Sequence, residues 1–136
     1  MTTPLSLKDL IEIICKKESW PCEPAGDGWV VEIPQPEKRK QRVFATTFVD
    51  GTNAMVRFTS RIGDAGKIDG GRALAALELN FKMPHGSMAT DRGLLVLTDT
   101  RPLRTTTPEA STQAIRYIAR QADTYERMLF GADDFH

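Results

Sequence analysis

Apolar residues recur along the chain with two different periods, and the change of period separates expected helices from expected strands. From about Leu5 to Glu18 the apolar side chains have helical spacing, at Leu7, Leu10, Ile11 and Ile14. This spacing predicts an amphipathic helix. Ser6 followed by Asp9 is typical of a capping box at its start.

Two further helices are expected from the same period. Between about Gly71 and Phe81, an alanine- and leucine-rich segment carries an apolar stripe of Leu74, Leu77 and Phe81, and we expect this helix to be fully packed. The last helix is marked by Thr107 as N-cap and Pro108 at the first helical position, and Gly131 closes it. Its stripe consists of Ile115, Ile118, Ala122, Tyr125 and Leu129.

Alternating apolar residues between the first two helices predict three strands. "GWVVEIP" alternates Trp29, Val31 and Ile33 with Val30 and Glu32, and the runs "RVFATTFV" and "AMVRFTS" flank the turn residues "DGTN" as a hairpin. In the first run Val43, Ala45, Thr47 and Val49 share one face, and Phe44 and Phe48 share the other. Both faces carry apolar groups, so one should meet the helices and the other is left without a cover.

The remaining segments are expected to be a hairpin and its connections. Strands at about Ser87 to Thr90 and Leu94 to Thr98 flank a tight turn, Asp91 to Gly93, in which Gly93 suits a positive φ. "SWPCEPAGDG" predicts a loop, and the polar run "QPEKRKQR" predicts a solvated connection. The element order α-β-β-β-α-β-β-α with short connections predicts an α+β fold, a single antiparallel, twisted sheet of about five strands with three helices. Residues 1–136 are expected to form a single domain.

Composition narrows the classes of partner. Eighteen basic and eighteen acidic residues give a formal net charge of zero, so no global field favours nucleic acid or an anionic membrane. Cys15 and Cys22 have neither zinc-site spacing nor the pattern of a disulfide framework, and two reduced thiols are typical of a cytosolic protein. No targeting segment and no run of roughly 18 apolar residues is found, so we expect a cytoplasmic protein.

The glycine-rich loop and the segment around His85 are the candidate sites for chemistry. Arg61 and Ile68 stand where a Walker loop needs glycine and Ser or Thr, so the segment Gly63 to Gly71 does not match that motif. Asp64 and Asp69 are expected to cap turns and helices, and His85 and Ser87 lack the third group that activates a nucleophile. We therefore expect no enzyme, no cofactor and no metal.

Binding through apolar surface is the remaining class. The basic residues Lys38, Arg39, Lys40 and Arg42 beside Phe44 are weak grounds for nucleic-acid binding, because the chain is neutral as a whole. Exposed aromatic and methionine side chains are typical of adaptable partner-binding surfaces. The candidate partner-binding residues are Trp29, Val31, Phe44, Phe48 and Met55, and the alternative is that they are core.

The second half of the chain resembles YbjN-like proteins and the type III secretion chaperones that share their fold. The resemblance is carried by "ALELNFKMPHGSMATDRGLLVLTDTRPL" and the closing "YERMLFGADDF", with Leu79-Asn80 at the end of a helix, Gly86 before a hairpin and Leu129 before the tail Asp133-Asp134-Phe135. It implies the same element order in a protein that is often dimeric, and in the secretion chaperones a client segment lies along apolar patches. Those chaperones tend to be acidic, whereas this chain is neutral with a basic hairpin loop, which favours the YbjN-like side.

Pattern and resemblance together give one leading hypothesis and one alternative. The leading hypothesis is a non-enzymatic, chaperone-like protein-interaction module that binds a client protein segment through apolar sheet and helix surface. A homodimer is expected from the resemblance and from the stripe of the final helix. The alternative is a small ligand- or nucleotide-binding regulatory protein that uses the Gly63 to Gly71 loop.

Overall fold

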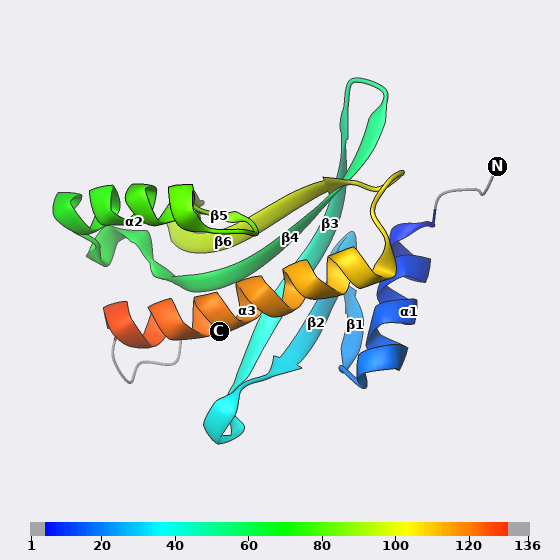
Figure 1. The fold of residues 1–136 in the computed structure, drawn as a ribbon, viewed down its shortest axis with the longest axis horizontal. Coiled ribbons are helices and arrows are strands. Elements are labelled where there is room, and N and C mark those ends of the chain that lie inside the picture. The colour runs from blue at the N-terminus through cyan, green and yellow to red at the C-terminus, as the bar shows by residue number, and fades with distance from the viewer. Residues whose placement is uncertain (1–4, 131–136) are drawn as a thin grey trace.

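The computed structural model describes residues 5–130, which form three α-helices and six strands around one sheet (Figure 1). The helices are α1 (Leu7–Glu18), α2 (Gly70–Lys82) and α3 (Pro108–Phe130), and two short 3-10 turns are η1 (Pro36–Lys38) and η2 (Ala65–Lys67). The strands are β1 (Cys22–Ala25), β2 (Gly28–Pro34), β3 (Lys40–Asp50), β4 (Asn53–Asp64), β5 (Ser87–Asp91) and β6 (Leu94–Pro102).

All six strands form one antiparallel sheet in the order β1-β2-β3-β4-β6-β5. The expected α+β class, the three helices and the antiparallel sheet are confirmed. The expected loop before β2 is wrong in one part, because Cys22–Ala25 pairs with Gly28–Val31 as an additional edge strand. Pro24 lies inside β1, and an edge strand tolerates proline because only one of its sides needs N–H donors.

Two helices cover one face of this sheet. In Figure 1, α3 crosses in front of the middle strands and α1 lies beside β1 and β2, next to the first turns of α3. Between these helices and the sheet lies one apolar core, and its fully buried side chains include Leu10, Ile11, Val31, Val43, Phe58, Leu97, Ile115 and Ile118. Amphipathic stripes and alternating strands thus bury their apolar sides against each other.

The helix starts form as the sequence indicates. The Ser6 hydroxyl accepts a hydrogen bond from the backbone N–H of Asp9, at 3.1 Å, and Thr107 accepts one from Ala110, also at 3.1 Å. Asp69 caps α2 through the N–H of Arg72, at 2.8 Å. Each of these oxygens satisfies a backbone donor that the first turn leaves without a partner.

Helix α2 differs from expectation, because it packs loosely at the end of the sheet. No residue of this helix is buried, and its expected core stripe is exposed, at 65% for Leu74, 63% for Leu77 and 93% for Phe81. Its C-terminal end is fixed to β5 by Asn80, whose side chain accepts a hydrogen bond from the Met88 N–H and donates one to the Met88 carbonyl. The prediction of a fully packed second helix is therefore wrong.

The connection between β2 and β3 is also less solvated than its polar sequence predicts. Arg39 donates two hydrogen bonds to the buried carboxylate of Asp123 on α3, at 3.1 and 3.0 Å. Gln41 is buried and donates to Ser60 Oγ and to the Arg61 carbonyl, both at 2.9 Å. Buried polar groups need such partners, so this charged segment contributes to the packing of α3 on the sheet.

Candidate partner-binding face

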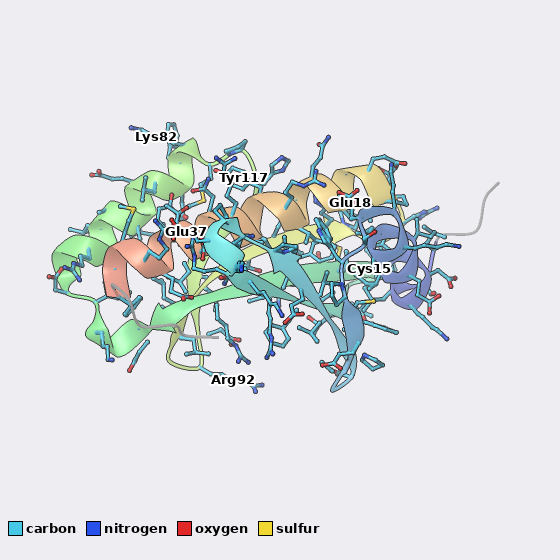
Figure 2. The ribbon with its side chains drawn as sticks, turned by 90° about the horizontal axis from the view of Figure 1, so that it is seen from below. Cys15, Glu18, Glu37, Lys82, Arg92 and Tyr117 are labelled. Atoms are coloured by element: carbon cyan, nitrogen blue, oxygen red, sulfur yellow. The ribbon has the colours of Figure 1, made fainter. Side chains whose placement is uncertain are left out.

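The sheet has a second face, opposite α1 and α3, which we call the open face. Along β3, buried Val43 and Ala45 point to the helices, so Phe44 and Phe48 point to the open face, where both are half-buried. Figure 2 shows Lys82 of α2 and Tyr117 of α3 on the same side of β4, away from Arg92 in the β5–β6 turn. The helices therefore leave the middle of the open face uncovered.

Two arginines lie over the two phenylalanines of the open face. The guanidinium carbon of Arg57 is 4.3 Å from the ring centroid of Phe48, and that of Arg61 is 4.7 Å from the centroid of Phe44. The antiparallel register places Met55 opposite Phe48. We call these five residues of β3 and β4 the arginine–aromatic strip.

The cations of the strip have no anionic partner among the residues that the structure describes. Neither Arg57 nor Arg61 has a carboxylate within 4.0 Å, and the nearest polar contact of Arg57 is a 3.4 Å hydrogen bond from Nε to the Thr100 hydroxyl. Glu32 of β2, toward the margin of the sheet, is 4.0 Å from Lys40. The centre of the open face is consequently cationic and aromatic.

The structure brings together three of the five candidate residues named from the sequence. Phe44, Phe48 and Met55 lie on the open face, whereas Trp29 and Val31 point to the helices. Trp29 packs partly against the core, and Val31 is fully buried. Val31 is therefore corrected to a core residue, because a fully buried side chain offers no surface to a partner.

Sequence reasoning missed Arg57 and Arg61, although the chain carries a signal for them. In "AMVRFTSRI" the period of two puts Met55, Arg57, Thr59 and Arg61 on one face of β4. Their pairing with Phe48 and Phe44 depends on the β3–β4 register, which follows from the position of the Asp50–Asn53 turn.

The glycine-rich loop and His85 have structural partners. Asp64 accepts a hydrogen bond from the Gly66 N–H at 2.9 Å, so the carboxylates of Asp64 and Asp69 both act as caps, as expected. His85 Nδ1 lies 3.2 Å from Arg101 Nη2, and its ring meets Tyr117 edge-on at 5.5 Å. Within residues 5–130 no three or more His, Cys, Asp or Glu side chains gather in a way that could hold a metal ion.

The two cysteines lie on α1 and β1, and both are free thiols. Burial, followed by the hydrogen bond and the charge interaction with Cys22, raises the pKa of Cys15 to about 12. A thiol with so high a pKa holds almost no thiolate at neutral pH, so Cys15 is a poor nucleophile.

Comparison with known proteins relates this chain to solved structures of bound complexes. No family model matches the sequence, and no curated protein matches it. The crystal structure of the ExsC–ExsE complex matches with a TM-score of 0.62 and 14% identity, over 93% of this chain and 97% of the other. The structure of the HopA1–SchA chaperone–effector complex matches with a TM-score of 0.61 and 11% identity, over 91% of this chain and 99% of the other.

The chain has an α+β fold similar to that of the matched chains in these two complexes. At such low identity the likeness shows the arrangement of helices and strands, and residues have to be argued one at a time. In this α+β fold the open face carries the arginines and phenylalanines that lie outside the core, and α2 carries exposed apolar side chains. None of the helices in the described part of the chain is both long and apolar enough to span a membrane.

Proposed function

We propose that this protein is a non-enzymatic, chaperone-like module that binds an extended segment of a client protein along the open face. The observation that carries this proposal is the placement of Phe44, Phe48 and Met55 on a sheet face that none of the helices within residues 5–130 covers along β3 and β4. The likeness to a chaperone–effector complex supports it. Apolar side chains gathered on an open face are typical of sites for protein partners.

The shape of the open face favours an extended segment. Strands β3 and β4 contain 11 and 12 residues, and they present their outward side chains in rows. An extended chain repeats its side chains on one side every second residue, so it can match such rows along their length. A short helix would contact only part of the strip.

The test compares two aspartate substitutions at neighbouring positions of β3. Phe48→Asp places a charge on the strip, whereas Val49→Asp places the same charge on the other face, at a side chain that is already 70% exposed. In pull-downs from native lysate, quantified by mass spectrometry, we expect one specific client to be lost with Phe48→Asp and retained with Val49→Asp. Recovery of the same client by both folded variants would contradict the proposed face.

Trp29 is not a suitable site for this test. Its side chain packs partly against the core on the helix side, so an aspartate there would disturb folding as well as any binding. Phe48 is half-buried at the surface and its neighbour Met55 is also half-buried, so a folded variant is expected.

We also propose that two copies associate through α2. The stripe of α3, from which a dimer was expected, is largely used in the core, since Ile115, Ile118 and Ala122 are fully buried. The exposed stripe is on α2, where Leu74, Leu77 and Phe81 recur at helical spacing. Exposed leucines and a phenylalanine on one helix are typical of a surface that another helix covers.

A further inference from the structure

We propose that the client segment is acidic as well as apolar, with carboxylates about four residues apart that meet Arg57 and Arg61. This inference rests on the proposed function, because it gives the chemistry of the segment that the open face binds. It commits to a polypeptide with alternating apolar and acidic side chains. Both arginines and both phenylalanines take part.

The spacing comes from the strand that carries both cations. Arg57 and Arg61 point to the same face of β4, and four residues of an antiparallel strand span on the order of 13 Å. A second extended chain has the same rise, so carboxylates at its positions i and i+4 lie on one side and at the same separation. The position between them would face the surface near Thr59 of β4.

The rings limit the positions of the two guanidinium groups. A guanidinium over an aromatic face is attracted by the ring, and its N–H donors project from its edges in a fixed fork. At 4.3 and 4.7 Å from the ring centroids, both groups lie over rings of β3, and both arginines belong to β4, which is paired on both sides. Before any client binds, each guanidinium group is therefore positioned to donate two hydrogen bonds to the two oxygens of a carboxylate.

Desolvation decides which kind of segment can bind. Any chain that covers Phe44 and Phe48 must also remove water from the arginines above them. A purely apolar chain would leave two guanidinium groups buried without a counter-charge, and a basic chain would add repulsion. Only a segment that supplies acceptors at both positions compensates this cost, so the arginines select against the other segments.

A single-stranded nucleic acid is the other polymer that combines negative charge with stacking groups. It fits less well, because a guanidinium group already lies over each of the two rings, whereas nucleic-acid sites offer open rings to the bases. The formal net charge of the whole chain is also zero.

The test uses three fluorescein-labelled peptides that share an alternating apolar sequence and carry Glu, Gln or Lys at positions i and i+4. Fluorescence anisotropy measures their binding to the full chain, together with a labelled oligothymidine. We expect the Glu peptide to bind at least about tenfold more tightly than the Gln peptide, and the Lys peptide to bind most weakly. Higher salt should reduce the advantage of the Glu peptide.

Reversing the charge of the two arginines tests whether they cause the preference for the Glu peptide. Arg57→Glu combined with Arg61→Glu should reverse the order, so that the Lys peptide binds more tightly than the Glu peptide. The control combines Arg72→Glu with Arg104→Glu, which changes net charge equally at exposed positions outside the strip and should retain the wild-type order.

The outcomes separate this inference from the proposed function. Equal binding of the Glu and Gln peptides, with both lost in Phe48→Asp, overturns the acidic specificity and leaves the client face in place. The acidic specificity is also overturned if the variant with Arg57→Glu and Arg61→Glu still prefers the Glu peptide. It is overturned as well if the oligothymidine binds more tightly than the Glu peptide and this binding depends on Arg57. Absence of binding by all three peptides overturns it and counts against the proposed function as well.

Discussion

Gly86 is the residue whose backbone and surroundings most restrict replacement in the turn that leads into β5. Its φ is +69°, and a Cβ there would lie 2.6 Å from the carbonyl oxygen of Thr98 and 3.2 Å from Ile118. The left-handed conformation disfavours other residues, and contact with a backbone atom cannot be relieved by a change of rotamer. Two independent costs therefore meet at one position.

We expect Gly86→Ala to lower the free energy of unfolding by about 2–4 kcal/mol. This is the sum of the cost of holding an alanine in the left-handed conformation and the cost of displacing the backbone that its Cβ would meet. Gly51→Ala is the matched control, because its φ is +64° and no atom lies within 4 Å of the added Cβ. The control should lose only about 1 kcal/mol. Urea unfolding of both variants measures the difference, and equal losses would show that the contact with Thr98 costs nothing.

The thiol of Cys15 makes stability depend on alkaline pH. Its side chain is 5% exposed, and its pKa is raised to about 12 in the folded protein, against 9.0 for a free thiol. Above about pH 9 the unfolded chain loses this proton while the folded chain keeps it, so the unfolded state gains stability as pH rises.

We expect the urea midpoint to fall between about pH 8 and about pH 10.5, and Cys15→Ala to make this fall shallower. Burial raises the pKa of Tyr125 as well, so part of the slope should remain in the variant. Cys15→Ala will also lower stability at every pH by removing buried volume, so the slope and not the midpoint is the measure. Identical slopes would refute the role of Cys15.

At the scale of elements, the sequence was sufficient where one local signal fixes an element. The caps at Ser6 and Thr107 and the turn at Arg92-Gly93, where φ is +50° and +82°, formed where the pattern predicted them. These features depend on one or two residues and on backbone geometry. Strand β1 was missed because its four residues include a proline, and its only evidence is the partner strand β2.

The burial of elements could not be read from periodicity. The stripe of α2 has the same spacing as a core stripe, yet no element among residues 5–130 covers it. Periodicity states which side chains share a face and not what faces them. The same limit applies to the open face. Alternation placed Phe44 and Phe48 together, but only the β3–β4 register brought Arg61 and Arg57 over them.

At the scale of the whole molecule, two surfaces with different chemistry lie on different parts of the chain. The arginine–aromatic strip runs along the central strands β3 and β4 toward their hairpin turn. Helix α2, which carries the apolar stripe, lies at the end of the sheet near β5 (Figure 1). The first is cationic and suits an acidic segment, whereas the second is apolar and suits a copy of itself. Separate surfaces allow a dimer to keep both of its open faces free for clients.

This separation makes the dimer testable independently of client binding. By light scattering at micromolar concentration, we expect the wild type to have twice the 15.1 kDa mass of one chain, and Leu77→Glu to have the mass of one. Arg72→Glu is the control, because five helical positions place Arg72 away from Leu77, and it should remain dimeric. Leu77→Glu should still prefer the Glu peptide, since the strip is intact.

The wild-type mass also decides how the exposed stripe is explained. Leu77 and Phe81 of α2 are exposed to water. Burial of a large apolar side chain stabilises a protein by about 1.5–3 kcal/mol, and α2 lacks this stabilisation at both positions. A second copy recovers this for both chains at once, because a twofold axis pairs the same stripe with itself. A wild type that has the mass of one chain would refute association through α2, and the stripe would then be available to the client as a second apolar contact.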